Sequence, residues 1–333
     1  MERRASEPTE QDGVSSRPAS GRRRPDSMKP MIADSTQRVA TAARSGWRSF
    51  LAPGIALVAP AVLTFGAFLV LPLVSVFLIS TLHWSGYRLG DWTFVGADNF
   101  ARMFANAVFW KAFANTVVFT VTTTLILNVV GFGLALLIAS RVRGHVIARS
   151  VLFIPVLMSP VIIGLMWSRI LDAFGAVNQV ISIFNPLAQP ILFLGSGDLA
   201  LPSIIVATVW QYAGYDMLLY YAGLQRLPTE QLEAASLDGA GHRASIRHVI
   251  LPSLYPVIGT VVLLNVIGGL RIFDIVYVMT SGGPDRASEV MATYMYQAAF
   301  KLSDMGYASA IAVGIVVISV GAALLRQRWG GLR

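Results

Sequence analysis

The sequence predicts an all-α membrane protein with six transmembrane helices, and three observations support this fold class. Hydrophobic residues make up 55% of the chain and charged residues only 13%, whereas soluble domains average about 25% charged residues. Six apolar segments approach or exceed the roughly 20 residues that cross a bilayer as a helix. Basic residues concentrate in the first 50 positions and in short segments beside the apolar runs.

Residues 1–46 are expected to form a disordered, basic cytoplasmic tail. The stretch RPASGRRRPDSMKP mixes Arg, Ser and Pro without apolar periodicity, which is typical of segments that cannot bury a core. It does not resemble a signal peptide, because the first apolar run begins only near Leu51 and is longer than a signal-peptide core. Residues 47–333 are therefore assigned to one six-span domain.

The six predicted spans share a length sufficient for the bilayer, and five of them carry polar residues or prolines, which favours spans packed against one another. They are Leu51–Leu82, Thr116–Ser140, Val151–Leu171, Leu201–Leu224, Leu254–Met279 and Gly306–Leu325. Pro155 and Pro160 in the third span favour kinks. Such kinks are consistent either with a shaped cavity or with plain irregular packing.

The distribution of Lys and Arg predicts the orientation. With the N-terminus in the cytoplasm, nineteen basic residues fall on the inner side and seven on the outer side and its adjoining helix ends. Because positive charge is retained in the cytoplasm, both termini are expected there. The same distribution argues against a nucleic-acid-binding face, although the net charge is +8.

Metal and thiol chemistry find little support in the composition. The chain has no Cys, and its only histidines are His83, His145, His242 and His248, without zinc-binding spacing. No metal site and no cofactor are therefore expected.

One long polar stretch, EQLEAASLDGAGHRASIRHVILPSL, separates the fourth and fifth predicted spans. Thr229 is expected to cap a helix whose first turn holds Glu230 and Glu233. Gly239 is expected to end that helix in the left-handed conformation, and a second, basic helix leads to Leu251-Pro252. The stretch is interpreted either as an ordinary solvated connection or as a cytoplasmic docking element for a partner.

This stretch resembles the "EAA" signature of permeases in binding-protein-dependent ABC importers. The matching positions are Glu233, Ala234, Ala235, Gly239, Leu251 and Pro252, with Val249 where the pattern usually has Ile. The segments FVGADNFARMFANAVFWKAFANT, RSVLFIPVLMSPVIIGLMWSRILDAFGAVN, FDIVYVMTSGGP and YMYQAAFKLSDMGYASA resemble the sugar-type branch. The resemblance extends from about residue 50 to the C-terminus.

The resemblance implies a non-catalytic subunit, in a bacterial cytoplasmic membrane, that carries half of an import path for a sugar or related solute. It also implies cytoplasmic ATP-binding subunits docked on residues 225–252, a second permease subunit and an extracytoplasmic solute-binding protein. None of the three lysines, Lys29, Lys111 and Lys301, follows a glycine. A phosphate-binding loop of the Gly-Lys-Ser/Thr type is therefore absent, and a separate subunit would have to hydrolyse ATP.

Polar side chains within the predicted spans are candidates for the solute path, because such groups are costly in lipid. Tyr212, Tyr215, Asp216 and Tyr220 in the fourth span are expected to share one helical face. Asn265 and Gly269 in the fifth span are further candidates. Aromatic rings would cover sugar faces while polar groups bind hydroxyls. Interhelical packing is the alternative interpretation of the same residues.

Two other function classes were weighed against the importer. An ion-driven secondary carrier of a small polar solute would need no docking element. A membrane-embedded enzyme would need catalytic groups at one depth, whereas Asp216 has no acidic partner in the predicted spans.

Overall fold

A computed structural model describes residues 57–88, 90–140, 144–187 and 189–330. The predicted tail, residues 1–46, lies outside the described residues. The chain divides into two units, Met1–Val70 and Leu71–Arg333. In the first unit, residues 57–65 are helical and continue into the π-helix η2 (Gly66–Val70).

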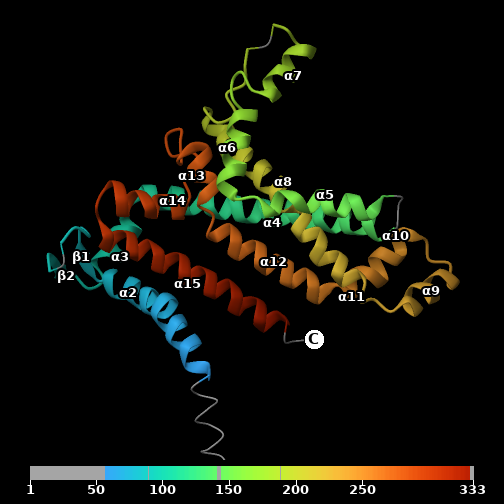
Figure 1. Ribbon diagram of the computed structural model, residues 1–333, viewed down its shortest axis with the longest axis horizontal. Coiled ribbons are helices and arrows are strands. Elements are labelled where there is room, and N and C mark those ends of the chain that lie inside the picture. The colour runs from blue at the N-terminus through green and yellow to red at the C-terminus, as the bar shows by residue number, and fades with distance from the viewer. Residues whose placement is uncertain (1–56, 89, 141–143, 188, 331–333) are drawn as a thin grey trace, which may run out of the picture. The chain divides into compact units, whose positions relative to one another are not determined.

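The second unit is helical apart from one small hairpin among its described residues (Figure 1). Strands β1 (Leu82–Trp84) and β2 (Trp92–Phe94) pair antiparallel, with His83 opposite Thr93. The first helices are α2 (Leu71–Ile79), α3 (Asp98–Ala105), α4 (Ala107–Ala139), α5 (His145–Leu157), α6 (Pro160–Ile170), α7 (Ala176–Phe184) and α8 (Gly197–Leu224). The remainder are α9 (Thr229–Leu237), α10 (His242–Ser245), η3 (Ile246–Ile250), α11 (Leu251–Ser253), α12 (Tyr255–Leu270), α13 (Asp274–Thr280), α14 (Met291–Tyr296), η4 (Gln297–Lys301) and α15 (Met305–Gly330).

The helical membrane architecture agrees with the prediction, but the number of spans does not reach six by length and composition. Within the described residues, three helices qualify, namely Leu57–Ile79, Ala107–Ala139 and Met305–Arg328. Two bent helix pairs raise the total to five. Helix α8 occupies the predicted fourth span without qualifying. Gly, Gln, Tyr and Asp residues lower its apolarity, and many of its side chains are buried against other helices rather than exposed to lipid.

The predicted third span, Val151–Leu171, is sharply bent, in agreement with the kink that its prolines favour. Helices α5 and α6 meet at an angle of 98°. The break lies at Met158 and Ser159, whose backbones are extended, and Pro160 begins the new helix with Ser159 as its N-cap. A residue before proline is driven out of the helical conformation, so Pro160 places the bend, while Pro155 is accommodated inside α5.

The predicted fifth span, Leu254–Met279, is also interrupted. Helix α12 ends at Leu270 and α13 begins at Asp274, so residues 271–273 separate them. Helix α13 packs against α6 and α8. The interruption therefore lets the second half of the predicted span turn toward the helices that follow the α5–α6 bend.

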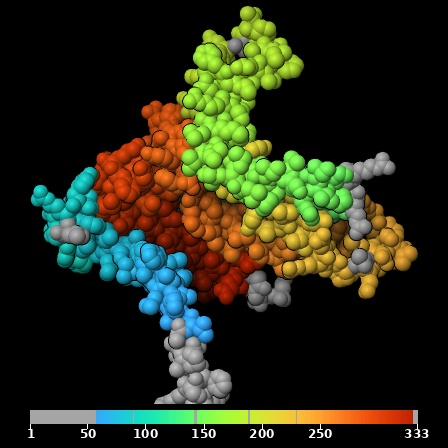
Figure 2. All heavy atoms as spheres, in the orientation of Figure 1, coloured from blue at the N-terminus to red at the C-terminus, as the bar shows by residue number. Residues whose placement is uncertain are grey.

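Helix α8 packs against α4, α5 and α12, and glycines allow two of these approaches. A Cβ atom at Gly214 would lie 1.9 Å from the Leu152 carbonyl oxygen of α5, and one at Gly131 of α4 would lie 2.6 Å from Asp216 Cβ. Small residues at such positions let helix backbones come close. Figure 2 shows that the α6–α7 segment, coloured yellow-green, projects away from these packed helices.

Candidate functional site

Helix α9, the first element of the polar stretch, ends in a complete Schellman turn. Gly239 has a φ of 79°. Its N–H donates to the Ser236 carbonyl oxygen at 3.1 Å, and the Ala240 N–H donates to the Ala235 carbonyl oxygen at 2.9 Å. These bonds satisfy carbonyl groups that a helix end leaves free. The prediction that Gly239 ends this helix is therefore confirmed.

The start of α9 differs from the prediction. Pro228, not Thr229, occupies the N-cap position, and Thr229 is the first helical residue. The N-cap residue lies outside the helical conformation, and Pro228 has an extended backbone with a φ of −60°. The predicted capping role of Thr229 is wrong because the helix begins one residue earlier than a Thr229 cap requires.

Several side chains of α9 are exposed on the surface of the described chain. Glu233 and Ala234 are exposed, Ala235 is half-buried, and the Leu237 side chain is 88% exposed. Leu237 is a residue that sequence analysis missed. Its signal was a large apolar residue at the C-terminal end of a helix that begins with polar residues.

The second element of the stretch is one helical run from His242 to Ser253, made of α10, η3 and α11. It meets α12 at an angle of 70°. Leu251 is half-buried and Pro252 is exposed, while Ile250 and Leu254 are buried and fix the run to the helices. The stretch from residue 225 to 253 therefore contains two helical segments, joined through the Gly239 turn, between α8 and α12. This agrees with the predicted pair of short helices.

A polar seam, consisting of Thr120, Thr124, Asn128, Asp216, Tyr220 and Asn265, lies between α4, α8 and α12. The Asn265 Nδ2 atom donates to Asp216 Oδ2 at 2.6 Å. The Tyr220 hydroxyl donates to Asn128 Oδ1, and Asn128 Nδ2 donates to the Thr124 carbonyl oxygen at 2.7 Å. The seam therefore links all three helices through hydrogen bonds.

Some atoms of the seam lack partners. Asp216 is fully buried, yet among the described residues its Oδ1 atom accepts no hydrogen bond, and neither Thr120 nor Thr124 finds a partner there for its hydroxyl group. Sequence analysis missed Thr120, Thr124 and Asn128. Their spacing of four residues along the second predicted span is the signal that would have found them.

The tyrosines of α8 differ in burial, although their spacings of three and four residues place them with Asp216 on one broad side of the helix. Tyr220 is buried, Tyr212 is half-buried and Tyr215 is 37% exposed. Tyr215 lies at the edge of this side. Tyr215 is thus the tyrosine of this set with the most open surface.

Gly269 lies where α12 packs closely against α4. A Cβ atom there would meet Thr120 Oγ1 at 2.7 Å, whereas one at Gly268 would meet no atom within 4 Å. The two neighbouring glycines therefore have opposite surroundings. Arg271 and Asp274, which lie three residues apart, form no ion pair in the part of the chain that the structure describes.

Two segments that are far apart in sequence join beyond the end of α13. Asn115 Nδ2 donates to the Ala287 and Glu289 carbonyl oxygens at 3.0 and 2.9 Å. The Met291 N–H donates to Thr116 Oγ1 at 2.9 Å. Glu289 is buried and pairs with Arg286 at 2.8 Å. Burial raises the pKa of Glu289 above its usual range, although Arg286 opposes the shift.

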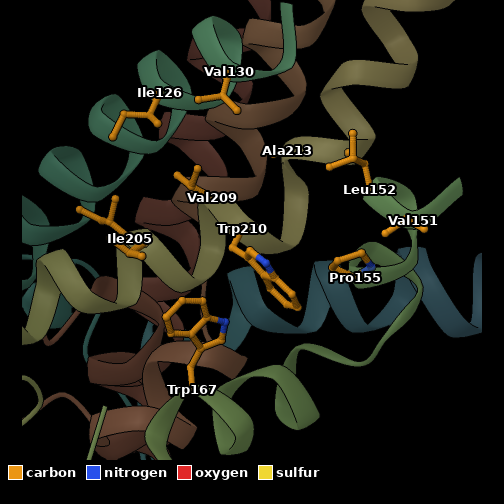
Figure 3. Close-up of a pocket in the computed structure, with 12 residues that line it drawn as sticks. Ile126, Val130, Val151, Leu152, Pro155, Trp167, Ile205, Val209, Trp210 and Ala213 are labelled. Atoms are coloured by element: carbon orange, nitrogen blue, oxygen red, sulfur yellow. The ribbon is translucent and has the colours of Figure 1, made fainter. Parts of the chain in front are cut away.

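An apolar pocket of about 500 Å³ opens between α4, α5, α6 and α8 (Figure 3). Trp167 and Trp210 meet edge to face across it, with ring centroids 5.9 Å apart. The lining is almost entirely aliphatic and aromatic. It offers few partners for sugar hydroxyls, so this pocket does not match the predicted solute path. The described residues contain no cluster of metal-binding side chains.

These features define a helical membrane protein with an exposed two-helix segment between α8 and α12. The family model described as "Binding-protein-dependent transport system inner membrane component" matches residues 147–329. The chain belongs to this family, whose members are non-catalytic permease subunits of ABC transporters.

Named relatives place the chain in the sugar-type branch of these permeases. The arabinooligosaccharides transport system permease protein AraP of Bacillus subtilis is 31% identical over 314 residues, which cover 91% of this chain and 98% of that protein. The trehalose/maltose transport system permease protein MalF of Thermococcus litoralis is 30% identical over 281 residues, which cover 84% and 94%.

The fold also matches a solved structure. A bacterial ABC transporter involved in the import of the acidic polysaccharide alginate contains a chain that superposes with a TM-score of 0.72 and 22% identity. The match covers 87% of this chain and 99% of that chain. This similarity extends the relationship from the sequence to the arrangement of the helices.

Proposed function

We propose that the chain forms half of the membrane path for a sugar or oligosaccharide and couples it to ATP hydrolysis by separate cytoplasmic subunits. The relatives are named for arabinooligosaccharides and for trehalose and maltose. A second permease subunit, an extracytoplasmic solute-binding protein and cytoplasmic termini complete the proposal. A related solved transporter is described in complex with an alginate pentasaccharide-bound periplasmic protein, which supports the binding-protein partner.

The observation that carries the coupling proposal is the exposed surface of α9. Glu233, Ala234 and Leu237 lie on a helix that ends in the Gly239 turn. A small residue beside an exposed leucine suits close docking against an apolar recess in a partner. Helix α9 and the helical run that follows it connect α8 directly to α12. A displacement of α9 by the docked subunit would therefore move both helices.

The seam explains how such a push would act inside the membrane. The Asp216–Asn265 hydrogen bond links α8 to α12, the two helices that flank the docking segment. In this proposal Asp216 and Gly269 position the helices, Tyr212 stands beside the path, and Tyr215 and Asn265 offer the solute its contacts. Half-buried Asn265 retains one amide hydrogen that no described group accepts.

The coupling proposal is tested by one pair of glycine substitutions. Gly239 and Gly241 both have open surroundings, but Gly239 has a φ of 79° and Gly241 a φ of −69°. Valine at the left-handed position costs about 1–3 kcal/mol of backbone strain, whereas Gly241 has a backbone that valine adopts readily. We expect Gly239→Val to abolish co-purification with the ATPase and its stimulation by loaded binding protein, and Gly241→Val to preserve both.

Equal coupling by the two variants would overturn the role of this turn. A Leu237→Asp variant provides a second measurement, because Leu237 is 88% exposed and buries little surface within the chain. If Leu237→Asp assembles and couples normally, α9 is not the docking surface.

A further inference from the structure

Helix α7 carries an apolar stripe that no described part of the chain covers. Ala176, Val180, Ile183 and Phe184 follow the four-, three- and one-residue spacings of a single helical face. All four are exposed, with Ile183 at 73% and Phe184 at 85%. Leu187, just beyond the helix, is 95% exposed and extends the stripe.

Hydrogen bonds of one buried side chain, Asn178, fix the helix that carries the stripe, and we call them the Asn178 brace. Asn178 lies on the opposite side of α7 and is buried. Its Nδ2 atom donates to the Asp172 and Ile191 carbonyl oxygens, each at 3.0 Å, and its Oδ1 atom accepts from the Ile191 N–H at 2.9 Å. These bonds join both ends of the loop that surrounds α7. The apolar face is therefore presented by an ordered element that projects from the helix bundle (Figures 1 and 2).

The composition of this region indicates what covers the stripe. No Asp, Glu, Lys, Arg or His occurs between positions 173 and 197. If the partner were a protein that binds and dissociates in each transport cycle, the uncharged surface would be exposed to water whenever that protein is unbound. Exposure of this apolar surface to water is energetically unfavourable. An occupant that is permanently present and equally uncharged fits better, and the hydrocarbon of the bilayer has both properties.

The size of the side chains distinguishes lipid from a neighbouring membrane helix. Where helices of this chain contact one another, as at Gly131 and Gly214, a glycine allows close approach. Helix packing in membranes generally uses such small residues. The stripe on α7 has only Ala176 as a small member and otherwise bulky branched or aromatic side chains, which suit fluid acyl chains.

The position of α7 along the chain, next to the start of α8, is consistent with a place at the membrane surface. Helix α8 begins next to the α7 loop and ends next to α9, and its 28 residues span about 42 Å, close to the thickness of a bilayer with its headgroups. With nine residues, α7 is too short to cross the membrane. It packs against α6, whose Ile162 and Leu165 are also exposed and whose helix belongs to a bent pair apolar enough to span. Exposed apolar side chains thus lie on both of these packed helices.

We propose that α7 is an interfacial anchor that inserts its apolar stripe into the leaflet opposite the α9 docking segment. Short amphipathic helices lie in this way with their apolar face in the headgroup and acyl boundary. The Asn178 brace sets the angle of the helix. The anchor would hold the α5–α6 bend at a fixed depth while α8 and α12 move.

The absence of Cys from the native sequence makes the test direct. Single cysteines at Ile183 and Phe184 would carry a nitroxide spin label, with Ser182→Cys as the matched control on the other side of the same helix. The full transporter, with partner subunits free of Cys, would be reconstituted in vesicles of phosphatidylethanolamine and phosphatidylglycerol. Collision rates of each label with oxygen and with a water-soluble nickel complex would then be measured.

The proposal requires a ratio of oxygen to nickel collisions that is several-fold higher at 183 and 184 than at 182. Low rates for both reagents at 183 and 184 would mean that a protein subunit covers the stripe, and would overturn the proposal. High nickel rates would mean that it faces water. Immobilisation of the labels only after binding protein is added would assign the stripe to that partner. Val180→Cys repeats the measurement if either first variant fails to assemble.

Discussion

Asn265 of α12 donates a 2.6 Å hydrogen bond to the fully buried carboxyl group of Asp216 in α8. This bond joins the two helices that enter and leave the exposed α9 segment. An ionisable residue inside a membrane is costly unless it has a partner. Asn265 is the only described side chain that donates to this carboxyl group.

A double-mutant cycle on Asp216→Ala and Asn265→Ala measures the strength of this link. Interhelical hydrogen bonds in membranes contribute about 0.6–2 kcal/mol, so we expect a favourable coupling free energy in that range between the two positions. The measurement is unfolding of the purified transporter by denaturant. Leu264→Ala, a neighbouring exposed position, is the control and should show no coupling with Asp216→Ala.

Gly268 and Gly269 should respond oppositely to alanine. Gly269→Ala places a methyl group 2.7 Å from Thr120 Oγ1 and 3.0 Å from Thr120 Cα, and overpacking of this kind costs about 1–3 kcal/mol. Gly268→Ala meets open space and should be neutral, or stabilising by up to about 1 kcal/mol because alanine favours the helix. Thermal unfolding midpoints of the two variants distinguish these outcomes. A similar loss in both would contradict the close contact of α12 with α4.

Tyr215 and Tyr220 should separate solute contact from packing. Tyr215→Ala removes a partly exposed ring, so we expect KM for transport to rise several-fold with little change in stability. Tyr220→Phe removes the hydroxyl group that bonds Asn128, which should lower the free energy of unfolding by about 1 kcal/mol and leave KM unchanged. Transport assays in vesicles, combined with melting curves, test both. If Tyr215→Ala transports as the native chain does, the solute path lies elsewhere.

The buried Glu289 predicts a specific pH dependence of stability. Burial raises its pKa in the folded protein above the ordinary value of 4.5, so the folded state holds the proton more tightly than the unfolded state. The stability due to this proton is present below pH 4.5 and is lost as the pH rises through the raised pKa.

Glu289→Gln removes this titration while keeping the shape of the side chain. We therefore expect the melting temperature of the native protein, relative to that of Glu289→Gln, to fall as the pH increases from 4.5 through the mildly acidic range. A difference that rises with pH would show that Arg286, and not burial, controls this carboxyl group.

The amino-acid sequence by itself determined the features that depend on local composition and spacing. Apolar run lengths are a property of each segment alone, so they predicted helices near their observed positions, including α4, α8 and α15. The Gly239 turn followed from the same logic, because the left-handed conformation is a preference of the residue itself. The two-helix form of residues 225–253 could likewise be predicted.

Only the tertiary structure decided which faces of these helices meet. Spacing put Tyr215 and Asp216 in one candidate set, but burial depends on where α4 and α12 lie around α8, and they enclose Asp216 while leaving Tyr215 partly open. Pro160 marked where a kink could form, but the 98° angle between α5 and α6 and the contact of Asn115 with residue 289 could not be predicted from local patterns. A proline permits a bend in a helix, and a glycine permits a close approach of two helices. Contacts between residues distant in sequence determine at which positions the bend or the close approach occurs.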